Sequence, residues 1–166
     1  GNGITDEIAV GLGGLIKNNT SLTSFLISTR SIGDETVMKI AKALKNNTSL
    51  EKIYISGGKI DGDWNYDNYR DEDAVKKLVE ALENNTSLIE LTISGDTLGY
   101  RYAAEAIASL LENNTTLTEL NISNSDIDAE DIKEIAKGLK NNTTLKKLDI
   151  IENPIGNEGI KALAEA

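Results

Sequence analysis

The sequence contains neither cysteine nor histidine. Without cysteine the chain has no disulfide framework and no thiolate zinc site. Without histidine it lacks the commonest general base and metal ligand, together with the histidine-activated serine and cysteine nucleophiles. Only carboxylates, lysine and tyrosine remain for acid–base chemistry. We therefore predict that the protein is not an enzyme and uses no cofactor.

Positive charge is also scarce, with 17 Lys and Arg against 27 Asp and Glu and a formal net charge of −10. A surface of this sign repels nucleic-acid phosphates and anionic membranes, so neither is predicted as a partner. No hydrophobic run approaches the length of a membrane span, and no apolar N-terminal run indicates a signal peptide. We expect a cytoplasmic location.

One phrase, Asn-Asn-Thr followed by Ser or Thr and then Leu, occurs five times. The intervals between copies are 28, 38, 29 and 28 residues, and the phrases end at Leu22, Leu50, Leu88, Leu117 and Leu145. A fixed period in this range is typical of a solenoid. The 166 residues are predicted to form a single repeat domain, with units near 1–17 (partial), 18–45, 46–83, 84–112, 113–140 and 141–166.

Each unit combines a strand pattern with a helix pattern. After each phrase two apolar residues lie two apart, as Leu91 and Ile93 do, which is the spacing of a strand with one buried face. Apolar residues then recur with helical spacing, and one such set is Val37, Ile40, Ala41 and Leu44. Strands that are joined by returning helices run parallel. We predict an α/β solenoid with about five strands and six helices.

The repeated phrase has a predicted role at the turn from helix to strand. Asn tolerates the left-handed conformation that ends helices, and Asn and Thr side chains can cap backbone groups before the next strand. The phrase also matches the N-glycosylation acceptor pattern at Asn18 and its four equivalents. Because the turn already explains the phrase, glycosylation is not predicted.

With these repeats the chain resembles the leucine-rich repeat family, in its ribonuclease-inhibitor-like class of about 28 residues per repeat. The resemblance covers essentially the whole chain and implies a horseshoe segment, with a parallel sheet on the concave side and helices on the convex side. It also implies a module that binds other proteins. The family usually has Asn or Cys three residues after the last strand leucine. Asn153 matches, whereas the other four places hold Arg30, Gly58, Asp96 and Ser125.

An insertion of about ten residues, 61–70, interrupts the repeat. Six of the seven aromatic residues are expected to gather around it, and they are the candidate partner-binding residues Tyr54, Trp64, Tyr66, Tyr69, Tyr100 and Tyr102. Exposed Trp and Tyr are typical anchors of protein interfaces. The alternative is that the rings of the loop fold onto the edge of the solenoid and cover it.

The same loop contains a partial calcium-binding pattern. Asp61, Asp63, Asn65 and Glu72 stand at positions 1, 3, 5 and 12 of an EF-hand loop. Tyr66, however, occupies the position where the sharp turn requires glycine, and a strand precedes the loop in place of a helix. We interpret the segment as an acidic, solvated loop and keep calcium binding as an alternative.

The strand positions that alternate with the buried ones are predicted to line the concave face. They include Lys52, Tyr54, Glu90, Asn121 and Asp149. This mixed surface, with its many hydroxyl groups, suits a polar protein or peptide. Lys52 and Glu90 join the aromatic residues as candidate partner-binding residues.

The preferred interpretation is a protein–protein interaction module that binds through the concave face and the loop at 61–70. Residues 85–91 and 112–117 resemble the leucine-rich half of tropomodulin, which caps actin filaments, so an actin-binding domain is one alternative. A consensus or scaffold segment without a ligand of its own is another. Neither end shows a polar capping unit, which predicts end-to-end association of copies.

Overall fold

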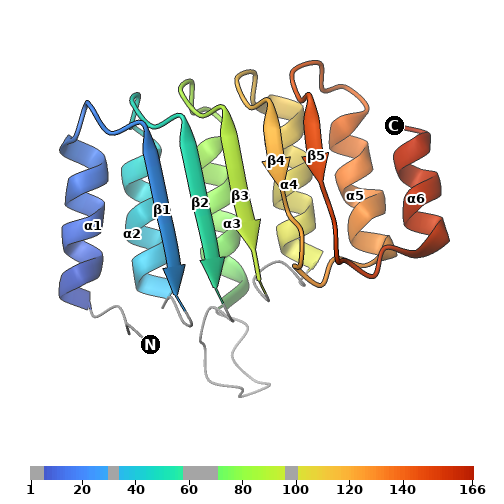
Figure 1. Cartoon of the computed structure of the whole chain (residues 1–166), viewed down its shortest axis with the longest axis horizontal. Helices are drawn as coiled ribbons and strands as arrows, with labels where there is room; N and C mark the ends of the chain where they lie inside the picture. The colour runs from blue at the N-terminus through green and yellow to red at the C-terminus, as the bar shows by residue number, and fades with distance from the viewer. Residues whose placement is uncertain (1–5, 30–33, 58–70, 96–100) are drawn as a thin grey trace.

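The computed structural model describes residues 6–29, 34–57, 71–95 and 101–166. Within these residues six helices alternate with five strands, as the period predicts (Figure 1). The elements are α1 (Asp6–Asn18), β1 (Ser24–Thr29), α2 (Asp34–Leu44), β2 (Lys52–Gly57), α3 (Asp71–Leu82), β3 (Glu90–Ser94), α4 (Arg101–Asn113), β4 (Glu119–Asn121), α5 (Ala129–Leu139), β5 (Lys147–Asp149) and α6 (Gly156–Ala164).

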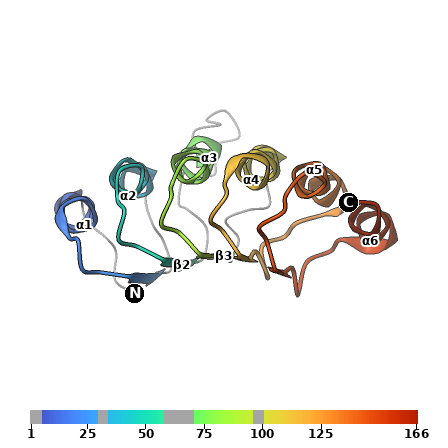
Figure 2. The same ribbon diagram turned by 90° about the horizontal axis from the view of Figure 1, so that it is seen from above.

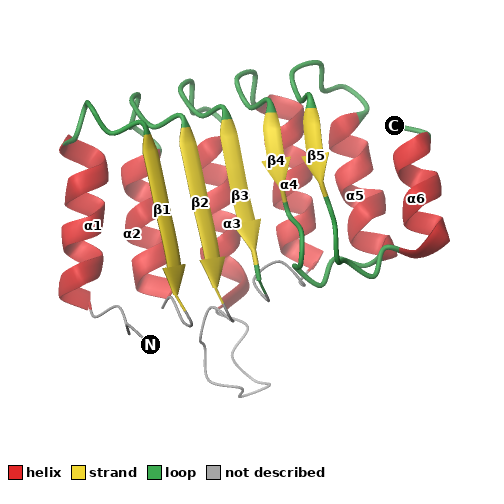
Figure 3. Cartoon of the chain, viewed as in Figure 1, coloured by secondary structure: helices red, strands yellow, loops and turns green. Residues whose placement is uncertain are grey.

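The strands form one parallel sheet in the order of the chain, β1-β2-β3-β4-β5. All helices lie on the same side of this sheet (Figure 3). Seen from above, the strands follow the inner arc of a curved molecule and the helices follow the longer outer arc (Figure 2). The predicted α/β solenoid, with a concave sheet and convex helices, is confirmed.

The apolar strand positions form rows between the sheet and the helices. Leu91 and Leu120 are partners in the parallel register, and both are fully buried. Ile40 and Leu44 of α2 are buried in the same core, so the helical stripe also faces inward as predicted. The apolar residues that lie two apart on each strand therefore determine which face of the sheet the helices cover.

The apolar positions of the last strand are less covered than those of the strand before it. Leu148 and Ile150 are only partly buried, whereas the equivalent Leu120 and Ile122 are buried. No unit of the described chain packs over Leu148 on its far side, because β5 is the last strand of the sheet. End-to-end association of copies through such a face stays a prediction.

The second asparagine of each phrase has a role that differs in part from the predicted one. In Asn85 the side-chain Oδ1 accepts hydrogen bonds from the backbone N–H groups of Ser87 at 2.9 Å and Leu88 at 2.8 Å. Its Nδ2 donates to the carbonyls of Leu44 at 3.2 Å and Asn47 at 3.0 Å, which lie at the end of α2 and in the phrase that follows it, one repeat earlier. The predicted capping before the strand is thus confirmed, and a link between units is added.

This asparagine ladder, defined as Asn19, Asn47, Asn85, Asn114 and Asn142, runs along the edge where the strands begin. Its central members are buried. The donation to a carbonyl near the end of the helix one repeat earlier recurs from Asn47 to Ile16 at 2.7 Å, from Asn114 to Leu82 at 3.0 Å and from Asn142 to Leu111 at 2.6 Å. Each unit is therefore hydrogen-bonded to its neighbour through a side chain that the phrase supplies.

The expected left-handed conformation at the phrases is wrong. Among the described residues the only non-glycine residues with positive φ are Asn124, Asp126 and Glu152, and none of them belongs to a phrase. The helices end instead in a turn in which the backbone N–H of the ladder residue donates to a carbonyl three or four residues earlier, as Asn85 does to Leu82 at 3.1 Å. Asparagine is needed because its side-chain amide both accepts and donates hydrogen bonds, and not because its backbone can adopt the left-handed conformation.

At the opposite edge of the sheet, Asn153 makes the link that the family pattern predicts. Its Oδ1 accepts from the N–H groups of Ser125 at 3.0 Å and Ile127 at 3.1 Å. Its Nδ2 donates to the carbonyls of Ile122 at 2.9 Å and Ile150 at 3.0 Å. Of the other four places only Ser125 is described, and its hydroxyl donates to the carbonyl of Ile93 in the preceding unit at 3.4 Å.

We predict that Asn85→Ala lowers the free energy of unfolding by about 2 to 4 kcal/mol, because each buried backbone group left without a partner costs about 1 to 3 kcal/mol. Urea denaturation followed by circular dichroism measures this. Asn84→Ala is the matched control, because Asn84 is the exposed neighbour in the same phrase. Equal effects of the two substitutions would contradict the ladder.

Candidate protein-binding surface

The concave face of the sheet is crossed by one central row of side chains. The parallel register aligns Leu26, Tyr54, Thr92, Asn121 and Asp149, one from each strand. Leu26 is 67% exposed and Tyr54 is 37% exposed, although both are large and mainly apolar. Thr92, in the middle of the row, is buried. The row therefore presents an apolar end on β1 and β2.

A second row, nearer the start of the strands, carries paired charges. Lys52 donates to a carboxylate oxygen of Glu90 at 2.7 Å, and Lys147 lies 3.8 Å from a carboxylate oxygen of Glu119. The hydrogen bond to Glu90 raises the pKa of Lys52 above its usual value. All four side chains are solvent-accessible, and such pairs contribute little to stability. Their effect is to neutralise this row.

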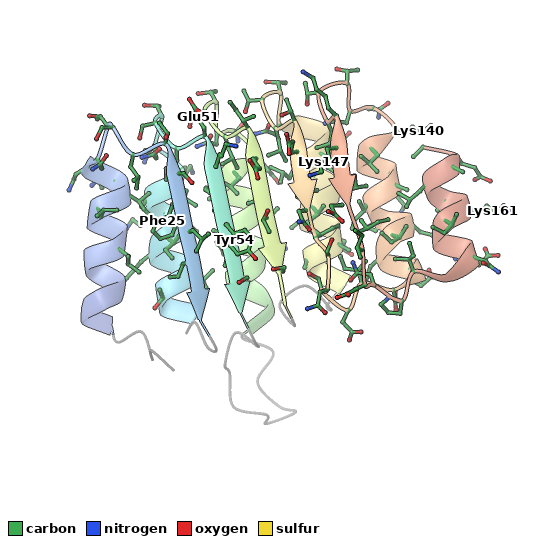
Figure 4. The ribbon with its side chains drawn as sticks, in the orientation of Figure 1. Phe25, Glu51, Tyr54, Lys140, Lys147 and Lys161 are labelled. Atoms are coloured by element: carbon green, nitrogen blue, oxygen red, sulfur yellow. The ribbon has the colours of Figure 1, made fainter. Side chains whose placement is uncertain are left out.

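Asp149 closes the central row at the other end with a negative charge. Its Oδ1 accepts from the Ser123 hydroxyl at 2.7 Å and from the Ile151 N–H at 3.3 Å. These hydrogen bonds, that of Ser123 first, lower the pKa of Asp149 below its usual value. Figure 4 labels Tyr54 on β2 and, on the strand that carries Asp149, Lys147. The carboxylate is ionised at neutral pH.

The structure describes three of the eight predicted partner-binding residues. Tyr54 lies on the concave face as expected, and Lys52 and Glu90 face each other as an ion pair. The remaining five are Trp64, Tyr66, Tyr69 and Tyr100, which lie outside the described residues, and Tyr102, which belongs to α4 but whose side chain is not described. The gathering of aromatic residues stays a prediction.

Leu26 was not singled out by the aromatic pattern, yet it is the most exposed of the large apolar side chains in the described chain. A signal for it is present in the sequence. Leu26 stands between Phe25 and Ile27, at a strand position that alternates with buried ones, where the other units hold Tyr, Thr, Asn and Asp. An apolar residue on the solvent side of a strand is informative when it neighbours another.

The alternative calcium pattern falls mainly outside the described residues. Asp61, Asp63 and Asn65 are not described, and Glu72 lies in α3 without a described side chain. In the described part of the chain no three or more acidic, histidine or cysteine side chains are grouped so that they could hold a metal ion. No helix in that part is long and apolar enough to cross a membrane.

Comparison with known proteins identifies the repeat. Residues 113–136 and 141–164 match the family model described as Leucine Rich repeat. These two stretches are leucine-rich repeats. The assignment of the chain to the ribonuclease-inhibitor-like class stays a prediction. No curated protein matches the chain in sequence.

Two solved structures share the fold over nearly the whole leucine-rich repeat chain. One is the Leiomodin-1 Actin-Binding Site 2, with a TM-score of 0.72, 24% identity and coverage of 99% of this chain and 90% of that chain. The other is the C-terminal domain of tropomodulin from Caenorhabditis elegans, with a TM-score of 0.63, 14% identity and coverage of 95% and 89%. At these identities the likeness establishes the fold.

We predict that Ser123→Ala raises the pKa of Asp149 toward its ordinary value, because the hydroxyl that stabilises the ionised carboxylate is removed. A lowered pKa in the folded state contributes stability above the unfolded pKa that is lost as the pH falls through the folded pKa. With the substitution, the free energy of unfolding should therefore decrease less as the pH is lowered from neutral through the pKa of Asp149. An NMR titration of the Asp149 carboxyl measures the shift. Ser94→Ala, on β3, is the control, and a pKa unchanged by Ser123→Ala would contradict the assignment.

Proposed function

We propose that this leucine-rich repeat domain is a protein-interaction module that binds its partner through the concave face of the sheet. The observation that carries the proposal is the exposure of Leu26 and Tyr54 side by side on neighbouring strands. The other face of the same strands is buried, for example at Ile53 and Ile55, so the two side chains stand on a rigid support. Large apolar and aromatic side chains held in this way are typical centres of interfaces.

The loop at 61–70 is proposed as a second part of the same interface. It follows β2, the strand that carries Tyr54, and precedes α3, so the chain connects it directly to the apolar end of the concave face. Its residues Trp64, Tyr66 and Tyr69 are of the type that anchors partners. Tyr100 and Tyr102, which belong to the next unit, complete the proposed set.

We further propose that the domain has no catalytic activity of its own. The absence of cysteine and histidine from the sequence and the open, curved form of the sheet both support this. One of the two similar structures is an actin-binding site of leiomodin-1, which supports a binding role. A cytoplasmic location belongs to the same proposal and rests on the sequence alone.

An actin-binding domain of the tropomodulin kind is the second candidate. The observation that favours it is the likeness to the Leiomodin-1 Actin-Binding Site 2 over 99% of this chain. The resemblance of residues 85–91 and 112–117 to tropomodulin points the same way. A scaffold segment without a ligand of its own is the outcome if neither binding activity is found.

We predict that Tyr54→Ala weakens partner binding by at least about 2 kcal/mol, the usual effect of removing an interface anchor, and that Tyr54→Ala with Trp64→Ala weakens it further. The measurement is affinity capture from an extract of the source cells with quantitative mass spectrometry. Met38→Ala is the matched control, because Met38 is a 41% exposed apolar residue on the convex helix α2. Partners that bind wild type and the control but not the Tyr54 variant support the proposal. Partners retained by every variant place the interface elsewhere.

For the second candidate we predict that the domain sediments with filamentous actin or forms a complex with monomeric actin. Co-sedimentation and analytical ultracentrifugation with purified actin test the two forms. A concave-face interaction should be lost with Leu26→Asp and kept with Met38→Ala. If neither form of actin binds at micromolar concentration, the actin-binding candidate is wrong, and the general interaction module is unaffected.

A further inference from the structure

The two ends of the central concave row differ in chemistry. Leu26 and Tyr54 are adjacent partners on β1 and β2, and Asp149 stands on β5 in the same row. Between them, Thr92 is buried and Asn121 is half-buried. A ligand that crosses the strands along this row meets an apolar pair first, then a low polar stretch, and finally a carboxylate.

No described lysine or arginine forms an ion pair with the carboxylate of Asp149, although the charge of Lys147 contributes to its lowered pKa. Lys147, two residues before it, is directed to Glu119, and Lys52 is occupied by Glu90. The partners of Asp149 are the Ser123 hydroxyl and the Ile151 N–H, which leave its negative charge in place. The net charge of −10 for the whole chain adds to the attraction for a cation at this position.

The length of the row limits the shape of the ligand. Leu26 and Asp149 are four strand spacings apart, which is about 19 Å at 4.8 Å per strand. An α-helix of about 13 residues has this length. The face of a sheet offers side chains and no free backbone groups, so an extended peptide lying across it would have only water as the partner of its own N–H and C=O groups. A helix pairs these groups internally.

From these observations we propose that the partner presents a basic amphipathic helix, which lies across the strands along the central row. One or two of its apolar side chains contact Leu26 and Tyr54, and a Lys or Arg about three turns further along pairs with Asp149. This inference rests on the proposed function and narrows it, because it states the chemistry of the partner and its direction on the concave face.

A display library of 18-residue peptides, biased toward helix formation and random at its exposed positions, tests the inference. Selection on the wild-type domain should enrich peptides with large apolar residues at one end and Lys or Arg about 10 to 13 residues away. Their affinity should fall at least about tenfold with Leu26→Ala and with Asp149→Asn, and this second effect should shrink at high salt. Asn keeps an acceptor oxygen for Ser123, so the fold is retained.

Matched controls separate the two ends of the row from the rest of the surface. Met38→Ala removes an exposed apolar side chain from α2, and Glu105→Gln removes an exposed carboxylate from α4. Both should leave the affinity within about twofold. Selection on the Asp149→Lys domain should replace the enriched Lys or Arg with Asp or Glu, because the sign of the contact is reversed. A proline placed in the middle of an enriched peptide should abolish binding.

The outcomes distinguish this inference from the proposal on which it rests. Peptides that lose affinity with Leu26→Ala but not with Asp149→Asn would overturn the basic-helix inference and leave the concave interaction surface standing. Binding that tolerates the central proline would overturn the helical form. Peptides indifferent to both substitutions, or a library from which nothing is enriched, would overturn the basic-helix inference, and the Tyr54→Ala capture experiment then decides whether the concave interaction surface stands.

Discussion

The stacking of this protein depends on one asparagine amide per repeat. From Asn47 onward, each ladder asparagine accepts from two N–H groups just before its own strand and donates to a carbonyl one repeat earlier, as Asn85 does toward Leu44 and Asn47. A strand cannot shift along its neighbour without breaking these bonds inside the core, where unpaired polar groups are costly. Apolar packing supplies most of the driving force for stacking, and the ladder determines the register in which it occurs.

The fixed register aligns side chains from different strands into rows on the concave face. Leu26, Tyr54 and Asp149 belong to three different units, and no single repeat contains more than one of them. They become one row because every unit is held at the same height by the ladder. Since the core and the ladder use the apolar positions and the phrase, the solvent-facing strand positions are free to differ. The properties of the concave face therefore depend on the residues by which the repeats differ.

Features that repeat with a local period can be predicted from the sequence alone. Strand pairs such as Leu91 and Ile93 and the helical stripe of α2 are properties of single segments, and the structure buries them as predicted. The ladder could not be derived in the same way, because its bonds join residues about 28 to 41 positions apart and Asn has several local uses. The same reasoning applies to Leu26, whose importance depends on Tyr54 of the next unit. The aromatic loop has no sequence period to constrain it.

The distribution of charge shows why net charge is a poor guide to this surface. With −10 overall, a uniformly acidic face would be the simple expectation, yet Lys52 with Glu90 and Lys147 with Glu119 neutralise the row nearest the strand starts. An ion pair carries no net charge, so the field on the concave face comes mainly from side chains without such a pair. In the described central row that side chain is Asp149, at the end opposite to Leu26. A row with a charge at one end and apolar side chains at the other has a direction, and a ligand that matches it can bind in one orientation only.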